Sequence, residues 1–375
     1  MKRPRAVDAA AIGLLAAFTG VHAQAPAPVG ASGASCAAET DDAKRLACYD
    51  AVFRKTQAAP AAPAAGLAPA ASSPPSSEPP ATHAAAMKPP PLRPAGDGSL
   101  SAAEVSNRFW ELRPQDKLGT FVVRTYQPNV MLPAHWTSDI NRTPSSPTHG
   151  PGGLFSEYQN TEAELQVSLR AKALEDFLLP NADLWFAYTQ KSIWQLWNSA
   201  DSSPFRSSDY QPEAMYVVPV SENLSPLPGD WRWRMATVGI AHQSNGQSDP
   251  LSRSWNRVTL GTAFDRGDWG LQLRWNHRLP EGGIDDNPDL LHYIGSTELS
   301  TNWLPGPSTV QFTWRLNPTD LSRGSQQLVW TRPVYPGRIE GLRWYVQIFN
   351  GYGETLLDYN HSQTSIGIGF TLFQL

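Results

Sequence analysis

The sequence is short of charged residues, of cysteine and of long apolar runs. Only 17% of its 375 residues are Asp, Glu, Lys or Arg, whereas a soluble domain usually carries about a quarter. Beyond the N-terminus there is no run of about 18 apolar residues, which excludes a bundle of membrane-spanning helices. The formal net charge of -4 gives no broad electrostatic basis for binding nucleic acid.

Two parts of different composition divide the chain. All 14 Trp lie at or after Trp110, whereas 14 of the 34 Pro precede residue 96. Between residues 56 and 95, Ala and Pro supply 25 of 40 positions. Such a composition cannot bury a core, so we expect a semi-extended linker there. Residues 96–375 are expected to form the folded body.

The N-terminus has the features of a secretory signal. Three basic residues fall within the first five, and a short apolar stretch follows at residues 9–21. Val21-His22-Ala23 then provides a small-residue cleavage site, so residues 1–23 are expected to direct export. A membrane anchor is the alternative, but the apolar stretch is too short to span a bilayer.

Cys36 and Cys48 are the only two cysteines. In an exported chain they most simply form one disulfide, which would close a small knot within a periplasmic segment at residues 24–55. A metal site is the weaker alternative, because two thiols without a nearby His leave the coordination sphere incomplete.

The folded body repeatedly alternates apolar residues with polar or small ones. Residues 342–348 read Leu-Arg-Trp-Tyr-Val-Gln-Ile, and residues 366–372 read Ile-Gly-Ile-Gly-Phe-Thr-Leu. Side chains alternate between the two faces of a strand, so this pattern predicts strands with one apolar face. We predict twelve, near residues 117–126, 163–174, 183–192, 213–222, 230–243, 254–264, 268–278, 292–301, 309–316, 326–333, 341–350 and 362–373.

The strand pattern favours a membrane barrel over a soluble sandwich. The polar face is rich in Gly and Gln, and the apolar face carries Trp and Tyr near the strand ends. Both features are typical of an outer-membrane barrel, whose apolar residues face lipid and whose polar residues face the lumen. An even number of strands also suits closure of an antiparallel bacterial barrel. We therefore predict an all-β fold, a 12-stranded antiparallel transmembrane β-barrel.

One hairpin, at residues 238–260, combines this alternation with reactive side chains. His242 and Ser244 are two residues apart on one strand, so they share a face at about 6–7 Å between Cα atoms. The next strand can bring Asn256 beside His242. This face also carries apolar side chains such as Ile240 and Leu260 and is the presumed lipid-facing side.

These three residues have the chemical types of a hydrolase triad. A serine becomes a nucleophile when a base takes its proton, and His titrates in a suitable range. An Asn oxygen can accept the ring N–H and so fix the imidazole tautomer, as Asp does. The alternative is an Asn- and Ser-rich hairpin loop with a surface His, since H-x-S alone is a weak signal.

The segment HQSNGQSDPLSRSWNR, residues 242–257, resembles the active-site segment of the bacterial outer-membrane phospholipase A family. The resemblance extends to TQKSIWQLWNSADSSPFR (189–206), DDNPD (285–289) and GYGETLLDYN (351–360), and it covers roughly residues 110–375. Family membership implies a twelve-stranded barrel in the cell outer membrane that hydrolyses phospholipid acyl esters. It also implies dependence on calcium and activation as a homodimer.

The resemblance assigns roles to individual residues of the hairpin. His242 matches the family's base, Ser244 its nucleophile and Asn256 the partner that fixes the tautomer. The backbone N–H groups of Ser244 and Gly246 match the oxyanion hole, where fixed donors stabilise developing negative charge.

The resemblance also implies a calcium site. Ser252 matches a ligand through its hydroxyl and Gln247 through its backbone carbonyl, while Ser202 would come from the partner subunit. Position 247 often carries Arg in the family, a change that a carbonyl ligand should survive. Asp249 and Asp286 are acidic loop residues that could hold calcium in the monomer, since calcium prefers oxygen ligands.

Gln190 shares its face with Tyr188 and Ser192 on the presumed outside of the barrel. A lone amide facing hydrocarbon is costly unless it finds a partner. The family has a Gln at the matching position of its dimer interface, so we interpret Gln190 as a subunit contact. The alternative is a lumen-facing Gln in a slipped register.

The sequence therefore predicts a calcium-dependent phospholipase A, of both the A1 and A2 types, acting on the sn-1 and sn-2 esters of membrane phospholipids and on lysophospholipids. A non-catalytic porin-like channel is the alternative, although a twelve-stranded barrel has a narrow lumen that side chains can largely fill. A third possibility is a soluble β-sandwich esterase.

Overall fold

The computed structural model describes residues 40–41, 44–45, 101–153, 155–201, 204–338 and 340–373. The predicted signal peptide, Cys36 and Cys48, and the predicted linker at 56–95 lie outside these residues. Within them, no helix is long and apolar enough to cross a membrane.

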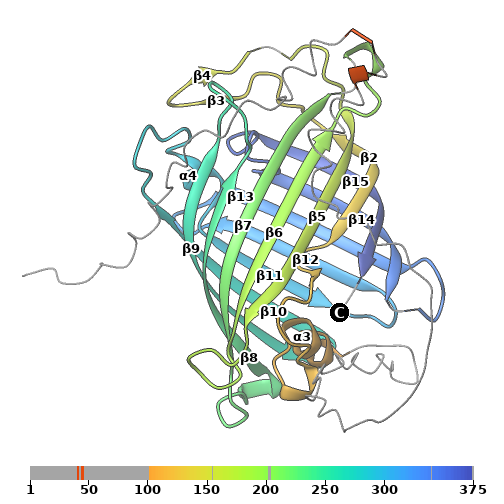
Figure 1. The fold of residues 1–375 in the computed structure, drawn as a ribbon, viewed down its shortest axis with the longest axis vertical. Coiled ribbons are helices and arrows are strands. Elements are labelled where there is room, and N and C mark those ends of the chain that lie inside the picture. Colours follow the sequence, from red (N-terminus) through yellow and green to blue (C-terminus); the bar gives the residue numbers. More distant parts are fainter. Residues whose placement is uncertain are drawn as a thin grey trace, which may run out of the picture. The chain divides into compact units, whose positions relative to one another are not determined.

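Twelve antiparallel strands form a closed β-barrel, which confirms the predicted fold class (Figure 1). Each strand pairs with the next along the chain from β5 to β15, and β2 closes the ring between β15 and β5. The barrel strands are β2 (Asn129–Thr137), β5 (Thr161–Leu174), β6 (Asp183–Trp194), β7 (Phe205–Pro219), β8 (Arg232–Ser244), β9 (Ser254–Arg266), β10 (Trp269–Leu279), β11 (Thr297–Trp303), β12 (Thr309–Asn317), β13 (Asp320–Pro333), β14 (Gly341–Tyr352) and β15 (Ser362–Phe373).

Shorter elements complete the described chain. Helix α3 and two of the short elements, η1 and β1, precede the first barrel strand, and the other pieces lie in the connections between barrel strands. They are α3 (Ala102–Trp110), α4 (Leu290–Ile294), the 3-10 turns η1 (Pro114–Asp116), η2 (Ser199–Asp201) and η3 (Pro228–Asp230), and the two-residue strands β1 (Arg124–Thr125), β3 (Ser145–Ser146) and β4 (Gly150–Pro151).

The sequence prediction of the first strand was wrong. Residues 117–126 contribute only β1, because Gly119 and Phe121 have φ of 83° and 60°, which interrupts an extended run. The first barrel strand is instead β2, whose pairing with β5 shifts register between Leu132 and His135. Pro133 lies within that shift and lacks a ladder N–H, so the bulge hides this strand from the alternation signal.

Alternation sorts the side chains between lipid and lumen as predicted. On β14, Leu342, Trp344 and Ile348 are exposed, whereas Arg343 and Gln347 are buried. Aromatic rings gather at strand ends; Trp269 and Trp303, for example, stack at 5.5 Å between ring centroids. An apolar outer band flanked by aromatic residues is characteristic of outer-membrane barrels.

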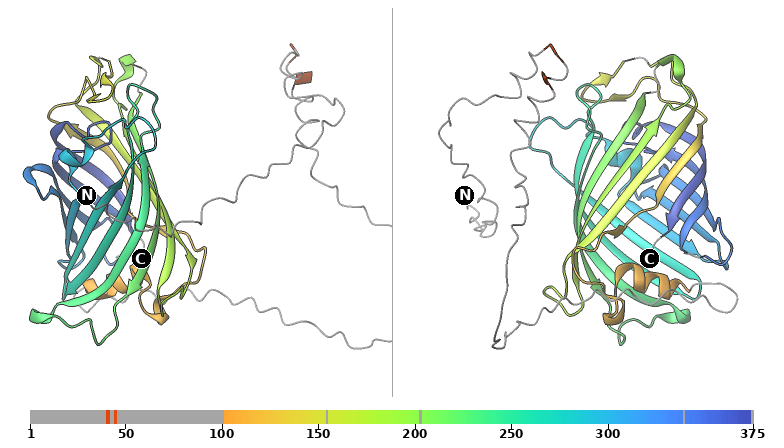
Figure 2. Two further views of the ribbon diagram at one scale, coloured as in Figure 1. Left: turned by 90° about the vertical axis from the view of Figure 1, so that its left-hand side faces the viewer. Right: turned by 45° about the vertical axis from the view of Figure 1, so that its right-hand side comes forward.

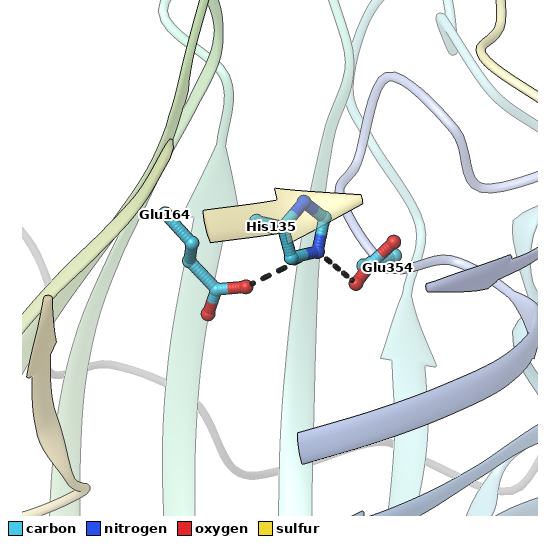
Figure 3. A group of neighbouring side chains, drawn as sticks. All are labelled: His135, Glu164 and Glu354. Atoms are coloured by element: carbon cyan, nitrogen blue, oxygen red, sulfur yellow. Dashed lines mark hydrogen bonds and ion pairs between the residues drawn. The ribbon is translucent and has the colours of Figure 1, made fainter. Parts of the chain in front are cut away.

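Several charged groups inside the barrel are paired with one another. The buried Arg206 guanidinium lies 2.6 Å from Glu162 Oε1 and 2.8 Å from Asp358 Oδ2. His135 Nε2 lies 3.0 Å from Glu354 Oε1 and 3.7 Å from Glu164 Oε2 (Figure 3). These pairings satisfy charges that would otherwise destabilise a water-poor interior. The rest of the lumen contains a cavity of about 480 Å³.

Helix α3 lies across one end of the barrel, opposite β3 and β4 (Figures 1 and 2). The Arg170 guanidinium stacks 3.7 Å from the Phe109 ring centroid, and Trp110 is buried against Met215 and Met235. The strand directions place the connections 245–253, 280–296 and 353–361 at the other end, where the candidate site is found.

Candidate active site

The register between β8 and β9 sets His242 directly opposite Asn256. His242 Nδ1 lies 2.9 Å from Asn256 Oδ1. Because an amide oxygen can only accept, Nδ1 carries the ring proton, and in the neutral imidazole Nε2 then has the free lone pair. Within the described residues Nε2 makes no hydrogen bond, so it can serve as a base.

The two side chains face away from the lumen. Ile240, two residues before His242, is 61% exposed. The sequence neighbours on the opposite face are buried: Ala241 beside His242, and Trp255 and Arg257 on either side of Asn256. Ser244 ends β8 two residues after His242 and has the same orientation along the strand. His242, Ser244 and Asn256 therefore lie on the side of the hairpin that carries the exposed Ile240.

The loop after Ser244 is held by the side chain of Asn245. Its Nδ2 donates to the Leu251 carbonyl at 2.7 Å, and its Oδ1 accepts from Gln247 N at 3.3 Å and Arg253 N at 3.0 Å. The Arg253 guanidinium donates to the carbonyls of Pro250 and Ser252 at 3.0 and 2.6 Å. Buried side chains thus fix both ends of a loop that would otherwise be mobile.

Gly246 has the left-handed φ of 63° in this loop. A Cβ added there would lie 3.0 Å from Tyr210 Cε2, so the position suits glycine both by conformation and by space. Within the described residues, the Gly246 N–H donates no hydrogen bond. It is therefore available to a bound negative charge next to Ser244.

Two other loops, from distant parts of the sequence, meet the loop of this hairpin. Ser252 Oγ donates to Asp286 Oδ2 at 2.5 Å, and Ser254 N donates to Asn287 Oδ1 at 3.0 Å. From the third loop, Thr148 Oγ1 donates to the Asp285 carbonyl at 2.6 Å. The DDNPD segment thus lies against the end of the hairpin.

His149 brings a nitrogen to this group of loops. Its Nε2 lies 2.7 Å from Asp286 Oδ1 and 3.5 Å from Asp249 Oδ1. Burial acts to raise the pKa of the Asp286 carboxyl, but hydrogen bonds from His149 and Ser252 outweigh it, so this pKa lies below its ordinary value. Asp286 is accordingly an anion at neutral pH.

Two further residues predicted from the sequence, Ser202 and Gln190, lie outside the hairpin. Ser202 lies outside the described residues. Gln190 faces outward beside the exposed Phe186 and Tyr188, which rules out the lumen-facing alternative. Its side chain accepts from Tyr188 Oη at 3.4 Å and donates to Ser192 Oγ at 3.3 Å.

Sequence reasoning missed the supporting residues Asn245, Arg253 and His149. Asn245 and Arg253 lie inside the quoted motif, and their position between the functional residues was a signal for them. His149 comes from a loop about a hundred residues earlier in the chain, where no period or motif marks it.

Comparisons with known proteins agree with this geometry. The profile of the family described as Phospholipase A1 matches residues 106–372. A relative from Neisseria meningitidis serogroup B is 35% identical over 357 residues, which is 91% of this chain and 90% of that protein.

Solved structures of outer-membrane phospholipases are also similar. The Salmonella typhi enzyme, a dimer with bound calcium, is 30% identical with a TM-score of 0.59 and covers 75% of this chain and 99% of its own. An active-site Asn-to-Ala variant of Escherichia coli outer membrane phospholipase A is 29% identical with a TM-score of 0.60, at the same coverage of 75% and 99%.

Proposed function

The chain belongs to the phospholipase A1 family and is an outer-membrane phospholipase, and we propose that Ser244, His242 and Asn256 carry out its calcium-dependent ester hydrolysis. The proposed substrates are the sn-1 and sn-2 acyl esters of phospholipids, and lysophospholipids. The observation that carries this proposal is the 2.9 Å contact between His242 Nδ1 and Asn256 Oδ1 on the outward face of the barrel.

The first step is acylation of the enzyme. Ser244 Oγ attacks the ester carbonyl carbon while His242 Nε2 takes the hydroxyl proton. His242 then gives this proton to the departing glycerol oxygen, and the C–O bond of the ester breaks. Asn256 holds the ring in the required tautomer throughout.

The second step releases the fatty acid. A water molecule attacks the acyl-serine carbonyl, His242 takes its proton, and the proton returns to Ser244 Oγ as the acyl–enzyme bond breaks. In both steps the carbonyl oxygen becomes negatively charged. The backbone N–H groups of Ser244 and Gly246 are the proposed donors to that oxygen, and the Gly246 N–H has no competing acceptor within the described residues.

The residues around Ser252 fit calcium by donor type. The hydroxyl of Ser252 and the carboxylates of Asp286 and Asp249 are hard oxygen donors gathered at one loop junction, and calcium takes six to eight such ligands. We propose that Ser252, the Gln247 carbonyl and the partner subunit's Ser202 hold calcium in the dimer, with Asp249 and Asp286 as ligands in the monomer. When bound, the ion would add positive charge near the developing oxyanion.

Homodimer formation is the proposed condition for activity. The outward face around Gln190 carries Val167, its register partner, which is 54% exposed, and Leu169. The contacts of this amide with Tyr188 and Ser192 are long, at 3.4 and 3.3 Å, and a second copy would supply a further partner to a polar group in an apolar surface. The dimeric state of the Salmonella typhi enzyme supports formation of a homodimer.

The geometry favours a hydrolase over the channel alternative, because the reactive side chains face outward, while α3 and the Tyr359 loop line the lumen cavity. The closed barrel makes the β-sandwich alternative wrong.

The proposed function is tested by measuring fatty-acid release from mixed micelles with purified protein. We expect turnover with calcium, none in excess EDTA, and none by Ser244→Ala or His242→Ala although both variants fold. Wild-type rates from either variant would refute the triad, and unchanged rates in EDTA would remove calcium.

A further inference from the structure

We propose that His149, Asp249 and Asp286 form a second type of metal site, one that binds zinc and competes with calcium at the junction of the three loops. The zinc site is assigned from the described side chains alone. Its effect on catalysis rests on the proposed calcium-dependent function.

The ligand atoms converge closely enough for one ion. His149 Nε2 and one oxygen from each carboxylate all lie within 4.8 Å of one another, and the two nitrogen–oxygen distances are 2.7 and 3.5 Å. A tetrahedral zinc with bonds of about 2.0–2.1 Å sets its ligand atoms about 3.3 Å apart. Small side-chain movements would bring the three atoms to that spacing, with water as the fourth ligand.

The donor types favour zinc over calcium. Imidazole nitrogen is a good ligand for zinc and other late transition metals, whereas calcium takes oxygen ligands almost exclusively. Zinc would bind the Nε2 lone pair, so this nitrogen carries no proton in the complex. His149 would not be a ligand in a calcium site made only of oxygens. Its replacement should therefore weaken zinc binding more than calcium binding.

The site is also open to solvent, unlike the other histidine–carboxylate group. The Asp249 side chain is 69% exposed, and its carboxylate can receive an ion from solution. In the lumen, the neighbouring side chains of His135, Glu164 and Glu354 (Figure 3) are all buried. There, Ser365 and Gln363 already donate to Glu354, and Gln347 donates to Glu164, so a metal would have to compete with an established buried network.

Zinc at this position would use side chains that are also the proposed calcium ligands. Asp286 is shared, because its Oδ1 lies against His149 while its Oδ2 accepts from Ser252 Oγ. An ion bound by His149, Asp249 and Asp286 would also repel a second cation nearby. We therefore expect zinc to inhibit calcium-dependent hydrolysis.

The test is calorimetric titration of zinc into the calcium-free, full-length protein in detergent, followed by calcium titrations of the same samples. We expect one tight zinc site, and His149→Ala should weaken it by about tenfold or more, since loss of even a supporting group commonly costs that much. The same variant, His149→Ala, should lose calcium affinity by a clearly smaller factor than zinc affinity.

Two control variants locate the site. His361→Ala removes another loop histidine, whose Nε2 lies 3.6 Å from the single carboxylate of Asp139, and should leave zinc affinity unchanged. His242→Ala should also retain zinc binding, which excludes the proposed catalytic base as the ligand. Asp286→Asn should weaken zinc and calcium together.

The outcomes separate this proposal from the proposed function. Equal zinc affinity in the wild type and His149→Ala, or equal loss of both metals, would overturn the zinc site even if the enzyme is calcium-dependent. Tight, His149-dependent zinc binding by a protein without calcium-dependent hydrolysis would retain the site and refute the function. Zinc inhibition that persists in His149→Ala would overturn the competition.

Discussion

The Asn245 side chain donates a hydrogen bond of 2.7 Å to the Leu251 carbonyl and thereby closes the loop that follows Ser244. The same side chain accepts from Gln247 N and Arg253 N. It therefore positions the Gly246 N–H and the Gln247 carbonyl, while Asn245 itself is buried. Asn245 is best described as a positioning residue.

We expect Asn245→Ala to lower kcat on the order of 100-fold, because small displacements of catalytic groups have costs of that size. It should also raise the calcium concentration needed for half-maximal rate. Steady-state kinetics across a calcium series measure both effects. Asn350→Ala, which removes an exposed amide bonded to Thr364 Oγ1 on the same barrel, is the matched control and should behave as wild type.

Gly246→Ala is expected to lower kcat by about 100-fold or more, in the range seen when one oxyanion donor is lost. An alanine at this position would have to adopt φ near 63°, and its methyl group would contact the Tyr210 ring. Gly337→Ala is the control, because Gly337 also has a positive φ, of 78°, but no atom within 4 Å of the added Cβ. Equal activity of the two variants would show that the Gly246 position plays no special role.

Replacing Asn256 distinguishes orientation of the base from simple packing. Asn256→Ala removes the acceptor of the His242 ring proton and should reduce kcat on the order of 100-fold. Asn256→Asp keeps an acceptor oxygen in place and should retain much more activity. If both variants lose activity equally, the hydrogen bond to Oδ1 is not what matters.

The buried ion pairs of the lumen should dominate stability. Arg206→Ala would leave Glu162 and Asp358 without their shared cation, and breaking a buried pair in this way costs about 3–5 kcal/mol. Urea-induced unfolding in detergent, followed by gel mobility of folded barrel, should detect this loss. The exposed Arg232→Ala should be nearly neutral, and a similar loss in both would contradict the pairing argument.

Alternation in the sequence was sufficient to predict most of the barrel and the core of the site. An apolar outer face fixes strand register, because a slip of one residue would reverse every side chain. Alternation alone was therefore enough to predict that His242, Ser244 and Asn256 share one face of the hairpin. The motif resemblance then supplied their proposed roles.

The loop cluster could not be predicted in the same way. His149 and Asp286 are 137 residues apart and are brought together only by the closed ring of strands. Loops have no hydrophobic period, so nothing local signals such a contact. Strand β2 was missed for a related reason, since the bulge at Pro133 breaks the period on which the prediction depended.

Identifying the residue that becomes covalently modified tests the central claim most directly. A fluorophosphonate probe for activated serines would be incubated with the full-length protein in calcium, and the adduct located by mass spectrometry. The account predicts modification of Ser244, its loss in EDTA, and its loss in His242→Ala. An adduct on a different serine, or lipid hydrolysis at the wild-type rate by Ser244→Ala, would contradict it.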